Sequence, residues 1–280
     1  EETPNNRMVG FPYTKYMNSI MRVNQSAALV ITSAKKAREL GIPESKWIFM
    51  HGGGCLNDIW NVTDRENLHS SPAIKKCAQA IFNAANCTQA DISFFDLYSC
   101  FPSAVQIARK EIGIPDGDNR DLTVTGGLPY YGGPGSAYVV NSIASMMSKL
   151  RENPGKFGMV TANGWFLTKH GVGVFSSNPF VGEWNQVIDS SHLQKEIDGL
   201  EHPKFIEEAN GKGSIETYTV VNSREGPTKA IIIGLLEDGR RFVANTEKDE
   251  NLLNKMMQNE MLNIKGTVKF ENTRNIFQPD

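Results

Sequence analysis

The sequence predicts a layered α/β domain followed by a small, OB-like β-barrel. Up to about residue 180, short apolar runs alternate with stretches whose apolar residues recur at helical spacing, which is typical of alternating strands and helices. From residue 214 onward, strand patterns follow one another closely, with glycine-containing turns between them and one helical stretch. With 280 residues, 40% of them hydrophobic, the chain can bury one large core, or a medium core and a small second domain.

The predicted helices of the first domain have recognisable starts and stops. Ser33 can cap a helix that Gly41 ends, and Ser71 followed by Pro72 begins a strongly amphipathic helix. The run 51–54, His-Gly-Gly-Gly, predicts a flexible or closely approached turn, because the chain lacks the G-x-S-x-G motif of lipases that would accompany an oxyanion loop. The predicted strands are 26–32, 47–50, 92–97, 122–125, 158–164 and 171–175, and the predicted helices are 34–40, 71–83, 102–112 and 136–150.

Beyond residue 180 the composition becomes polar, which predicts a linker over residues 181–213 with a short helix at 202–209. The β module that follows spans residues 214–280. Its predicted strands are 216–221, 229–236, 240–245 and 264–270, with a helix at 250–261 before the last strand. The module has no concentrated basic and aromatic face, so packing or protein interaction is a better prediction for it than oligonucleotide binding.

Composition also limits the class of protein. A net charge of −2 with interspersed signs does not favour nucleic acid as a partner, and no apolar run approaches the roughly 20 residues of a membrane span. The polar start, residues 1–6, does not resemble a signal peptide. Four cysteines without C-x-x-C spacing argue against a metal site and favour a reducing compartment, so a cytoplasmic location is expected.

Residues 94–107 are the stretch on which the functional prediction depends. They read as the end of a buried strand, a tight turn and the beginning of a helix at Pro102, with Cys100 in the turn. The positive partial charge of a helix N-terminus stabilises a thiolate, so a lowered pKa is expected for Cys100. The alternative is an inert cysteine packed between aromatic residues.

Three turns, each after a predicted strand, resemble the active-site loops of the thiolase superfamily. Residues 98–101, Tyr-Ser-Cys-Phe, take the place of the family's N-E-A-F or H-D-C-F segment. Gly126-Gly127 followed by Gly132-Gly133-Pro134 is similar to the G-G-x-x-x-x-G-H-P loop, with glycine in place of the histidine. Asn163-Gly164 lies about where the C-x-G loop begins.

The resemblance implies a domain organisation. Residues 1–45 would be the end of a thiolase N-terminal half, and residues 46–180 a C-terminal-type domain with α/β/α layers. Residues 181–213 would be the linker, and 214–280 the additional OB-like domain of thiolase-like proteins labelled acetyl-CoA acetyltransferases. Most of the N-terminal half, which carries the family's nucleophilic cysteine, has no counterpart in this sequence. A chain or segment of that type, in a homo- or hetero-oligomer, is therefore an expected partner.

The resemblance implies an enzyme of lipid metabolism that acts on a coenzyme A thioester. The implied reaction is acyl transfer with formation or cleavage of a carbon–carbon bond. Cys100 would be the general acid/base, and His170 a substitute base that folds back into the space at Gly133. Tyr98 and Asn163 would polarise the thioester. The substrate-binding backbone would be formed by Gly132, Gly133, Pro134 and Gly164. No metal or cofactor is expected beyond the acyl-CoA substrate.

The sequence also allows other interpretations of these residues and of the protein's function. His170 can equally be a surface residue beside Lys169, and Tyr98 an ordinary packed tyrosine. The protein can also be an aldol-type lyase subunit acting on steroid side-chain CoA esters, usually with an OB-fold partner chain. A further alternative is a subunit that binds CoA or supports an assembly without catalysis, because the loop histidine is replaced.

Overall fold

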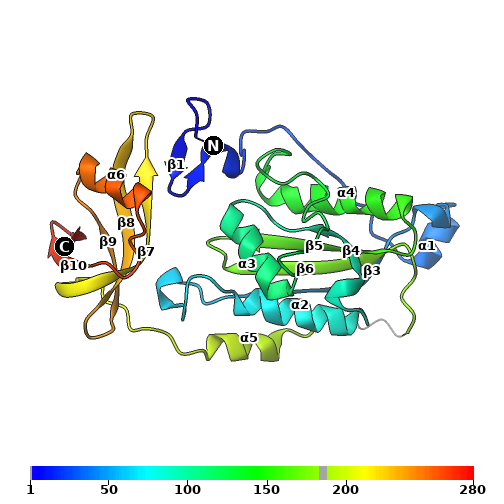
Figure 1. Cartoon of the computed structure of the whole chain (residues 1–280). Coiled ribbons are helices and arrows are strands. Elements are labelled where there is room, and N and C mark those ends of the chain that lie inside the picture. The colour runs from blue at the N-terminus through cyan, green and yellow to red at the C-terminus, as the bar shows by residue number, and fades with distance from the viewer. Residues whose placement is uncertain (1, 183–187) are drawn as a thin grey trace. The chain divides into compact units, whose positions relative to one another are not determined.

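The computed structural model describes residues 2–182 and 188–280. The chain divides into two compact units (Figure 1). The α/β unit consists of Asn18–Trp60 with His69–Gly199, and the barrel unit consists of Glu1–Met17, Asn61–Leu68 and Leu200–Asp280.

The α/β unit is built on a four-stranded sheet in the order β3-β6-β5-β4. Its strands are β3 (Phe49–Asn57), β4 (Ile92–Asp96), β5 (Phe157–Gly164) and β6 (Lys169–Ser176). Strands β4 and β5 are parallel, whereas β6 runs antiparallel to both β5 and β3. The carboxyl ends of β3, β4 and β5 therefore meet the beginning of β6 at one edge of the sheet. This edge holds the candidate site.

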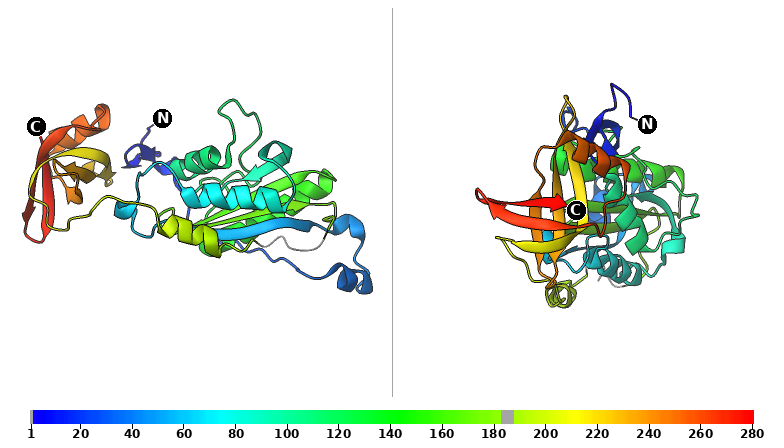
Figure 2. Two further views of the ribbon diagram at one scale, coloured as in Figure 1. Left: turned by 90° about the horizontal axis from the view of Figure 1, so that it is seen from below. Right: turned by 60° about the vertical axis from the view of Figure 1, so that its left-hand side comes forward.

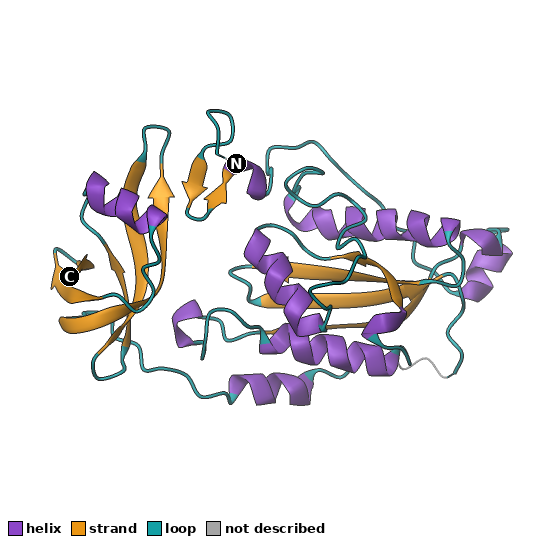
Figure 3. Ribbon diagram, in the orientation of Figure 1, coloured by secondary structure: helices purple, strands orange, loops and turns teal. Residues whose placement is uncertain are grey.

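Helices cover both faces of this sheet (Figures 1 and 3). On one face, Phe175 of β6 packs with Met146 and Leu150 of α4. On the other, Gly52 of β3 lies against Ile81 of α2, and α3 packs beside α2. The helices of this unit are α1 (Ala34–Glu39), α2 (Pro72–Ala84), α3 (Pro102–Ile112), α4 (Tyr138–Glu152) and α5 (Ser191–Asp198), with short 3₁₀ turns at Glu44–Lys46, Gln89–Asp91 and Gly135–Ala137. The 3₁₀ turn Val62–Asp64 belongs to the barrel unit. The predicted α/β/α layering is thus confirmed.

The capping residues act as the sequence predicts. The Ser71 hydroxyl accepts a hydrogen bond from the backbone N–H of Ile74 at 3.1 Å, and Pro72 is the first residue of α2. Helix α3 begins at Pro102 and ends before Gly113, whose φ of 85° closes the helix in the left-handed conformation. These local signals fixed both helix boundaries correctly because they need no tertiary contact.

The barrel unit closes a five-stranded sheet on itself. Strands β7 (Gly211–Asn222), β8 (Pro227–Leu236) and β9 (Arg241–Asn245) form an antiparallel meander. Strand β9 then pairs in parallel with β11 (Arg274–Pro279), and β11 pairs with β10 (Lys265–Glu271). Pairing of β10 with β7 closes the barrel. Helix α6 (Glu250–Gln258) connects β9 to β10, which together with β11 forms the hairpin shown in red in Figure 2. This is the predicted OB-like barrel. From the N-terminal segment, β1 (Met8–Gly10) and β2 (Tyr13–Thr14), followed by a 3₁₀ turn at Lys15–Met17, extend the sheet beyond β7.

Three sequence predictions about the α/β unit are wrong. Residues 26–32 form no strand, and Val30 and Ile31 in this run are 81% and 92% exposed. Residues 122–125 form none either, because the N–H groups of Val124 and Thr125 donate to a side chain, Asp96, and not to a neighbouring strand. The 51–54 run lies inside β3 and is not a turn. A Cβ at Gly52 would be 2.9 Å from Ile81, so glycine is required there by the close approach of α2.

The predicted helix at 202–209 is also wrong, and the helix of this region is α5. The N–H of Arg241 donates to the carbonyl of Lys204 at 2.8 Å, and the N–H of Ile206 donates to the carbonyl of Arg241 at 2.9 Å. This pairing with the beginning of β9 holds residues 204–206 in an extended conformation.

Candidate functional site

The site edge of the sheet brings together the ends of four strands. The turn after β4 carries Tyr98 and Cys100, and Asn163 is the penultimate residue of β5. His170, near the beginning of β6, is paired in register with Asn163 on one side and with Leu56 of β3 on the other. Asp58 directly follows β3. Side chains from distant parts of the sequence are therefore neighbours here because of the strand order.

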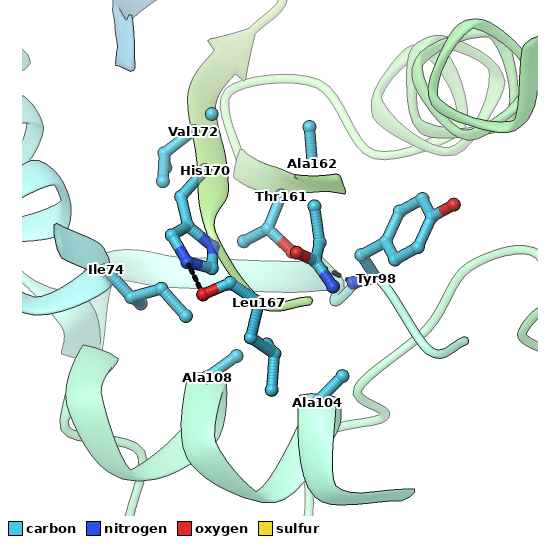
Figure 4. A pocket seen from close by; sticks show the side chains of 11 residues that line it. Ile74, Tyr98, Ala104, Ala108, Thr161, Ala162, Leu167, His170 and Val172 are labelled. Carbon is cyan, nitrogen blue, oxygen red and sulfur yellow. Dashed lines mark hydrogen bonds between the residues drawn. The ribbon is translucent and has the colours of Figure 1, made fainter. Parts of the chain in front are cut away.

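A small pocket lies between this edge and the helices α2 and α3 (Figure 4). Its polar lining comes from Tyr98, Thr161, Asn163 and His170, and the side chain of Leu167 and the alanines of α3 supply apolar lining. The cavity volume is about 10 Å³, which admits about one water molecule. The arrangement is thus a compact polar cluster with little free space.

Cys100 contacts Asn163 directly. The Nδ2 group of Asn163 donates to the Cys100 Sγ atom at 3.6 Å. Burial raises the pKa of the Cys100 thiol, and the hydrogen bonds from Asn163 and from the backbone N–H groups of Phe101 and Cys100 only partly oppose this effect. The lowered pKa expected from the sequence is therefore wrong, because removal from water outweighs the helix N-terminus. The thiol is the favoured form at neutral pH.

His170 is neither a surface histidine nor folded back toward Gly133. It is 4% exposed and lines the pocket from β6. Its Nε2 atom lies 3.0 Å from Oδ2 of Asp58 and 3.1 Å from the carbonyl oxygen of Leu167. The space at Gly133 belongs instead to Ser19, because a Cβ at Gly133 would lie 2.0 Å from the Ser19 hydroxyl. The predicted substitution of the loop histidine by His170 is thus corrected.

The glycine-rich turn contacts residues 19–25 of the same unit. A Cβ at Gly132, where φ is 110°, would lie 2.8 Å from Val23, and the N–H of Gly133 donates to the carbonyl of Ile20 at 2.8 Å. The N–H of Ser19 in turn donates to the carbonyl of Cys100 at 3.1 Å. Ser19 is therefore a shared neighbour of the cysteine turn and the glycine turn. Gly132, Gly133, Pro134 and Gly164 do not line the pocket, and their role in substrate binding stays a prediction.

Tyr98 and Asn163 both face the pocket, and Asn163 also donates a hydrogen bond to the thiol. The backbone N–H of Tyr98 donates to the Thr161 hydroxyl at 2.9 Å, and its ring meets the ring of Tyr138 edge-on at 5.4 Å. Burial, with a smaller effect of Cys100, raises the pKa of Tyr98, which keeps its hydroxyl a hydrogen-bond donor. The Oδ1 atom of Asn163 is buried and has no hydrogen-bond partner among the described residues. It is an acceptor available to a ligand or a water.

A buried carboxylate, Asp96 at the end of β4, holds the glycine turn in place. Its Oδ2 atom accepts hydrogen bonds from the N–H groups of Val124 and Thr125 at 2.9 and 3.1 Å and from the hydroxyls of Thr123 and Thr125 at 3.0 and 3.2 Å. Its Oδ1 atom accepts the Tyr138 hydroxyl at 3.0 Å. The side chain thus links the end of β4 to α4 and to the segment before Gly126.

The sequence did not identify Asp58, Thr161 and Asp96 as site residues, and it identified Ser71 only as a helix cap. A signal for Asp58 existed, since it directly follows a strand and Ser71 caps the next helix, so both lie at element ends. The prediction of a turn at 51–54 hid it by ending the strand too early. His51, by contrast, is buried between Phe157 and Phe180, with Nε2 2.8 Å from the carbonyl of Asn178, and does not line the pocket.

Within 2–182 and 188–280, no three His, Cys, Asp or Glu side chains gather as metal ligands do. None of the helices in the described part of the chain has the length and apolar character needed to cross a bilayer.

Comparison with known proteins agrees with the fold. Residues 192–273 match the family model for the additional C-terminal domain of thiolase-like protein type 1, and no curated protein matches the chain. The crystal structure of a monomeric SCP2-thiolase-like protein type 1 from Mycobacterium smegmatis matches with 35% sequence identity and a TM-score of 0.90. That match covers 100% of this chain and 60% of the other, so the chain spans about three fifths of that relative's length. The chain is a member of the thiolase-like superfamily that carries an additional C-terminal barrel domain.

Proposed function

We propose that this protein processes acyl-CoA thioesters, with Cys100 as the proton donor and acceptor at the α-carbon of the acyl group. Asn163 orients the thiol, His170 acts as a second base, and Tyr98 donates a hydrogen bond to the thioester oxygen. The nucleophile that takes the acyl group in the family would come from a segment of thiolase N-terminal type, on the same protein or on a partner chain.

The contact between Asn163 and Cys100 is the observation that carries this proposal. It joins two of the three turns that resemble thiolase loops, at the carboxyl ends of the neighbouring parallel strands β4 and β5. In open α/β sheets, this is the edge at which ligands bind. A serine hydroxyl beside Gly133, where thiolases have histidine, marks a difference from the standard site.

The protonation state of Cys100 favours one direction of proton transfer. When the carbon–carbon bond of a β-ketoacyl-CoA breaks, the electron pair of that bond stays on the α-carbon of the leaving acyl-CoA. A proton from the thiol then completes the product, and the thiolate remains on Cys100. Because burial raises the pKa of this thiol, the protonated form needed for cleavage is the one present at neutral pH. Bond formation needs the thiolate, so it is expected to speed up as the pH rises.

One observation favours a second candidate, a subunit that binds acyl-CoA without catalysis. The pocket admits about one water, and residues 19–25 contact the glycine turn that would approach the substrate. A site filled in this way binds a ligand at its rim and leaves Cys100 out of reach.

Exchange of the α-protons of acetyl-CoA in D₂O separates the two candidates, because it needs the acid/base group but not the nucleophile. We expect the protein to accelerate deuterium uptake, measured by mass spectrometry. Cys100→Ser is expected to reduce the accelerated rate by about 100-fold or more, the usual contribution of a general acid/base.

Cys87→Ser is the matched control, because Cys87 lies beyond the opposite end of α2. Its exchange rate should equal that of the wild type. Equal rates in wild type and Cys100→Ser would remove Cys100 from the chemistry. Saturable binding of acetyl-CoA without any exchange would favour the non-catalytic subunit.

A further inference from the structure

The hydrogen bonds around His170 determine which ring nitrogen carries the proton. Nε2 faces two acceptors, the carboxylate of Asp58 at 3.0 Å and the carbonyl oxygen of Leu167 at 3.1 Å. A nitrogen between two acceptors must be a donor, so the proton is on Nε2. In the neutral ring, Nδ1 is then an unprotonated acceptor. No hydrogen bond to Nδ1 is found among the described residues.

Asp58 is held firmly in the position that this requires. It is 3% exposed, and its Oδ1 atom accepts the backbone N–H of Ala73 in the first turn of α2 at 2.9 Å. Its Oδ2 atom accepts the hydroxyl of Ser71 as well as the ring N–H of His170. The positive end of α2 favours a carboxylate at this place. All three groups donate to Asp58. A side chain with acceptors at both oxygen positions, which a carboxylate is, therefore satisfies all of them.

The backbone of the turn between β5 and β6 also orients a hydrogen-bond acceptor toward His170. Trp165 and Leu167 have φ values of 61° and 53°, a left-handed conformation that is unfavourable for bulky side chains. This backbone presents the Leu167 carbonyl to His170, as the dashed line in Figure 4 shows, and places the Leu167 side chain in the pocket lining. Backbone strain of this kind is common where a side chain must be oriented for function.

On the pocket side, two acceptors have no hydrogen-bond donor within the described part of the chain. His170 and Asn163 form a cross-strand pair, both line the pocket, and the Oδ1 atom of Asn163 is buried and unpartnered within the described residues. A water molecule has the size that the cavity admits and the two O–H groups that these acceptors need. The polar end of the pocket is therefore built to receive a proton donor.

We propose that Asp58 is the positioning residue of this site: it fixes His170 in the Nε2–H tautomer, so that Nδ1 is the proton acceptor facing Asn163. The role of Nδ1 in catalysis rests on the proposed function, whereas the tautomer does not. The two parts can therefore be tested separately.

The tautomer is measured by ¹⁵N NMR of histidine-labelled protein at about pH 8, above the ordinary pKa of histidine. The chain has five histidines, and the His170 signals are those absent from His170→Gln. In the wild type we expect a protonated Nε2 and an unprotonated Nδ1. A proton on Nδ1, in either the other tautomer or the imidazolium, would overturn the proposal.

Asp58→Asn tests the cause. In this variant, the backbone N–H of Ala73 needs an acceptor, so the oxygen of the new side-chain amide should point toward Ala73. The amide NH₂ group then faces Nε2 of His170, and the ring proton is expected to move from Nε2 to Nδ1. Ser71→Ala removes a donor but leaves the carboxylate, and Asp91→Asn makes the same change at an exposed aspartate bound to Thr88. Both should retain the Nε2–H tautomer. Retention in a folded Asp58→Asn variant would show that Asp58 does not set it, and should that variant not fold, the wild-type spectrum alone decides.

Deuterium exchange of acetyl-CoA tests the functional half. Asp58→Asn is expected to lower the maximal exchange rate at least about tenfold with little change in the acetyl-CoA concentration for half-maximal rate, and Asp91→Asn should match the wild type. An equal maximal rate in Asp58→Asn, with the tautomer changed, would overturn the catalytic role of Nδ1. Absence of exchange in the wild type would overturn the proposed function, with the tautomer still decided by NMR.

Discussion

Replacing Arg241 with methionine is expected to lower the free energy of unfolding of the barrel unit by about 3–5 kcal/mol, the usual cost of breaking a buried ion pair. Arg241 is 1% exposed and is fully buried at the beginning of β9. Its guanidinium donates to both carboxylate oxygens of Glu216 at 2.6 and 2.7 Å. It also donates to three backbone carbonyls in the segment 63–66. Methionine fills a similar volume but donates a hydrogen bond to none of these acceptors.

Arg240→Met is the matched control for this experiment. Arg240 is the preceding residue, and its ion pair with Asp238 is exposed to solvent, so its loss should leave the unit as stable as the wild type. Hydrogen exchange of the barrel amides measures the local free energy without assuming that the two units unfold together. Similar exchange in the two variants would mean that Arg241 does not hold residues 61–68 to the barrel.

Asp96→Ala is expected to destabilise the α/β unit by about 3–5 kcal/mol, because each buried donor left unpaired costs about 1–3 kcal/mol. Asp96 is fully buried and accepts two backbone N–H groups and three hydroxyls. Burial and the charge of Asp96 raise the pKa of Tyr138, so that its hydroxyl stays protonated and donates. Alanine leaves the segment 123–125 and this tyrosine without their common acceptor.

The comparison with Asp96→Asn makes this prediction specific. An asparagine can direct its oxygen to Val124 and Thr125 and its NH₂ group to the Tyr138 oxygen, whose proton can turn to the Thr125 hydroxyl 2.7 Å away. Denaturation monitored by hydrogen exchange should therefore give a clearly smaller loss for Asn than for Ala. Equal losses would show that negative charge, and not hydrogen-bond satisfaction, is what this position needs.

The sequence predicted those parts of the fold that depend on local signals. Helices α2 and α3 were placed within a residue or two because their capping residues and apolar spacing are local. The glycines of β3 were wrongly predicted to form a turn. Glycine is needed at position 52 because α2, which follows in the sequence, packs against it, and this contact cannot be seen in the local sequence. The run 122–125 was misread because its partner is the Asp96 side chain, and side-chain acceptors leave no periodic pattern.

In the candidate site, too, local sequence signals were predicted correctly and features that depend on distant contacts were not. The motif resemblance selected Cys100, Tyr98 and Asn163, and the structure places the first and third in contact. The pKa direction of Cys100 was wrong because burial depends on elements far away in the sequence. Asp58 was missed because its role appears only when the end of β3, the beginning of α2 and the beginning of β6 are side by side.

Titration of Cys100, followed by the ¹³C NMR shift of its Cβ atom, tests most directly that Cys100 and Asn163 share one buried site. We predict that the pKa of the Cys100 thiol in the wild type is higher than that of an ordinary, solvent-exposed cysteine, because the thiol is buried. Asn163→Ala removes the hydrogen bond to Sγ, which stabilises the thiolate, so the pKa should rise further. A wild-type pKa below the ordinary value, or a pKa that Asn163→Ala leaves unchanged, would contradict the account.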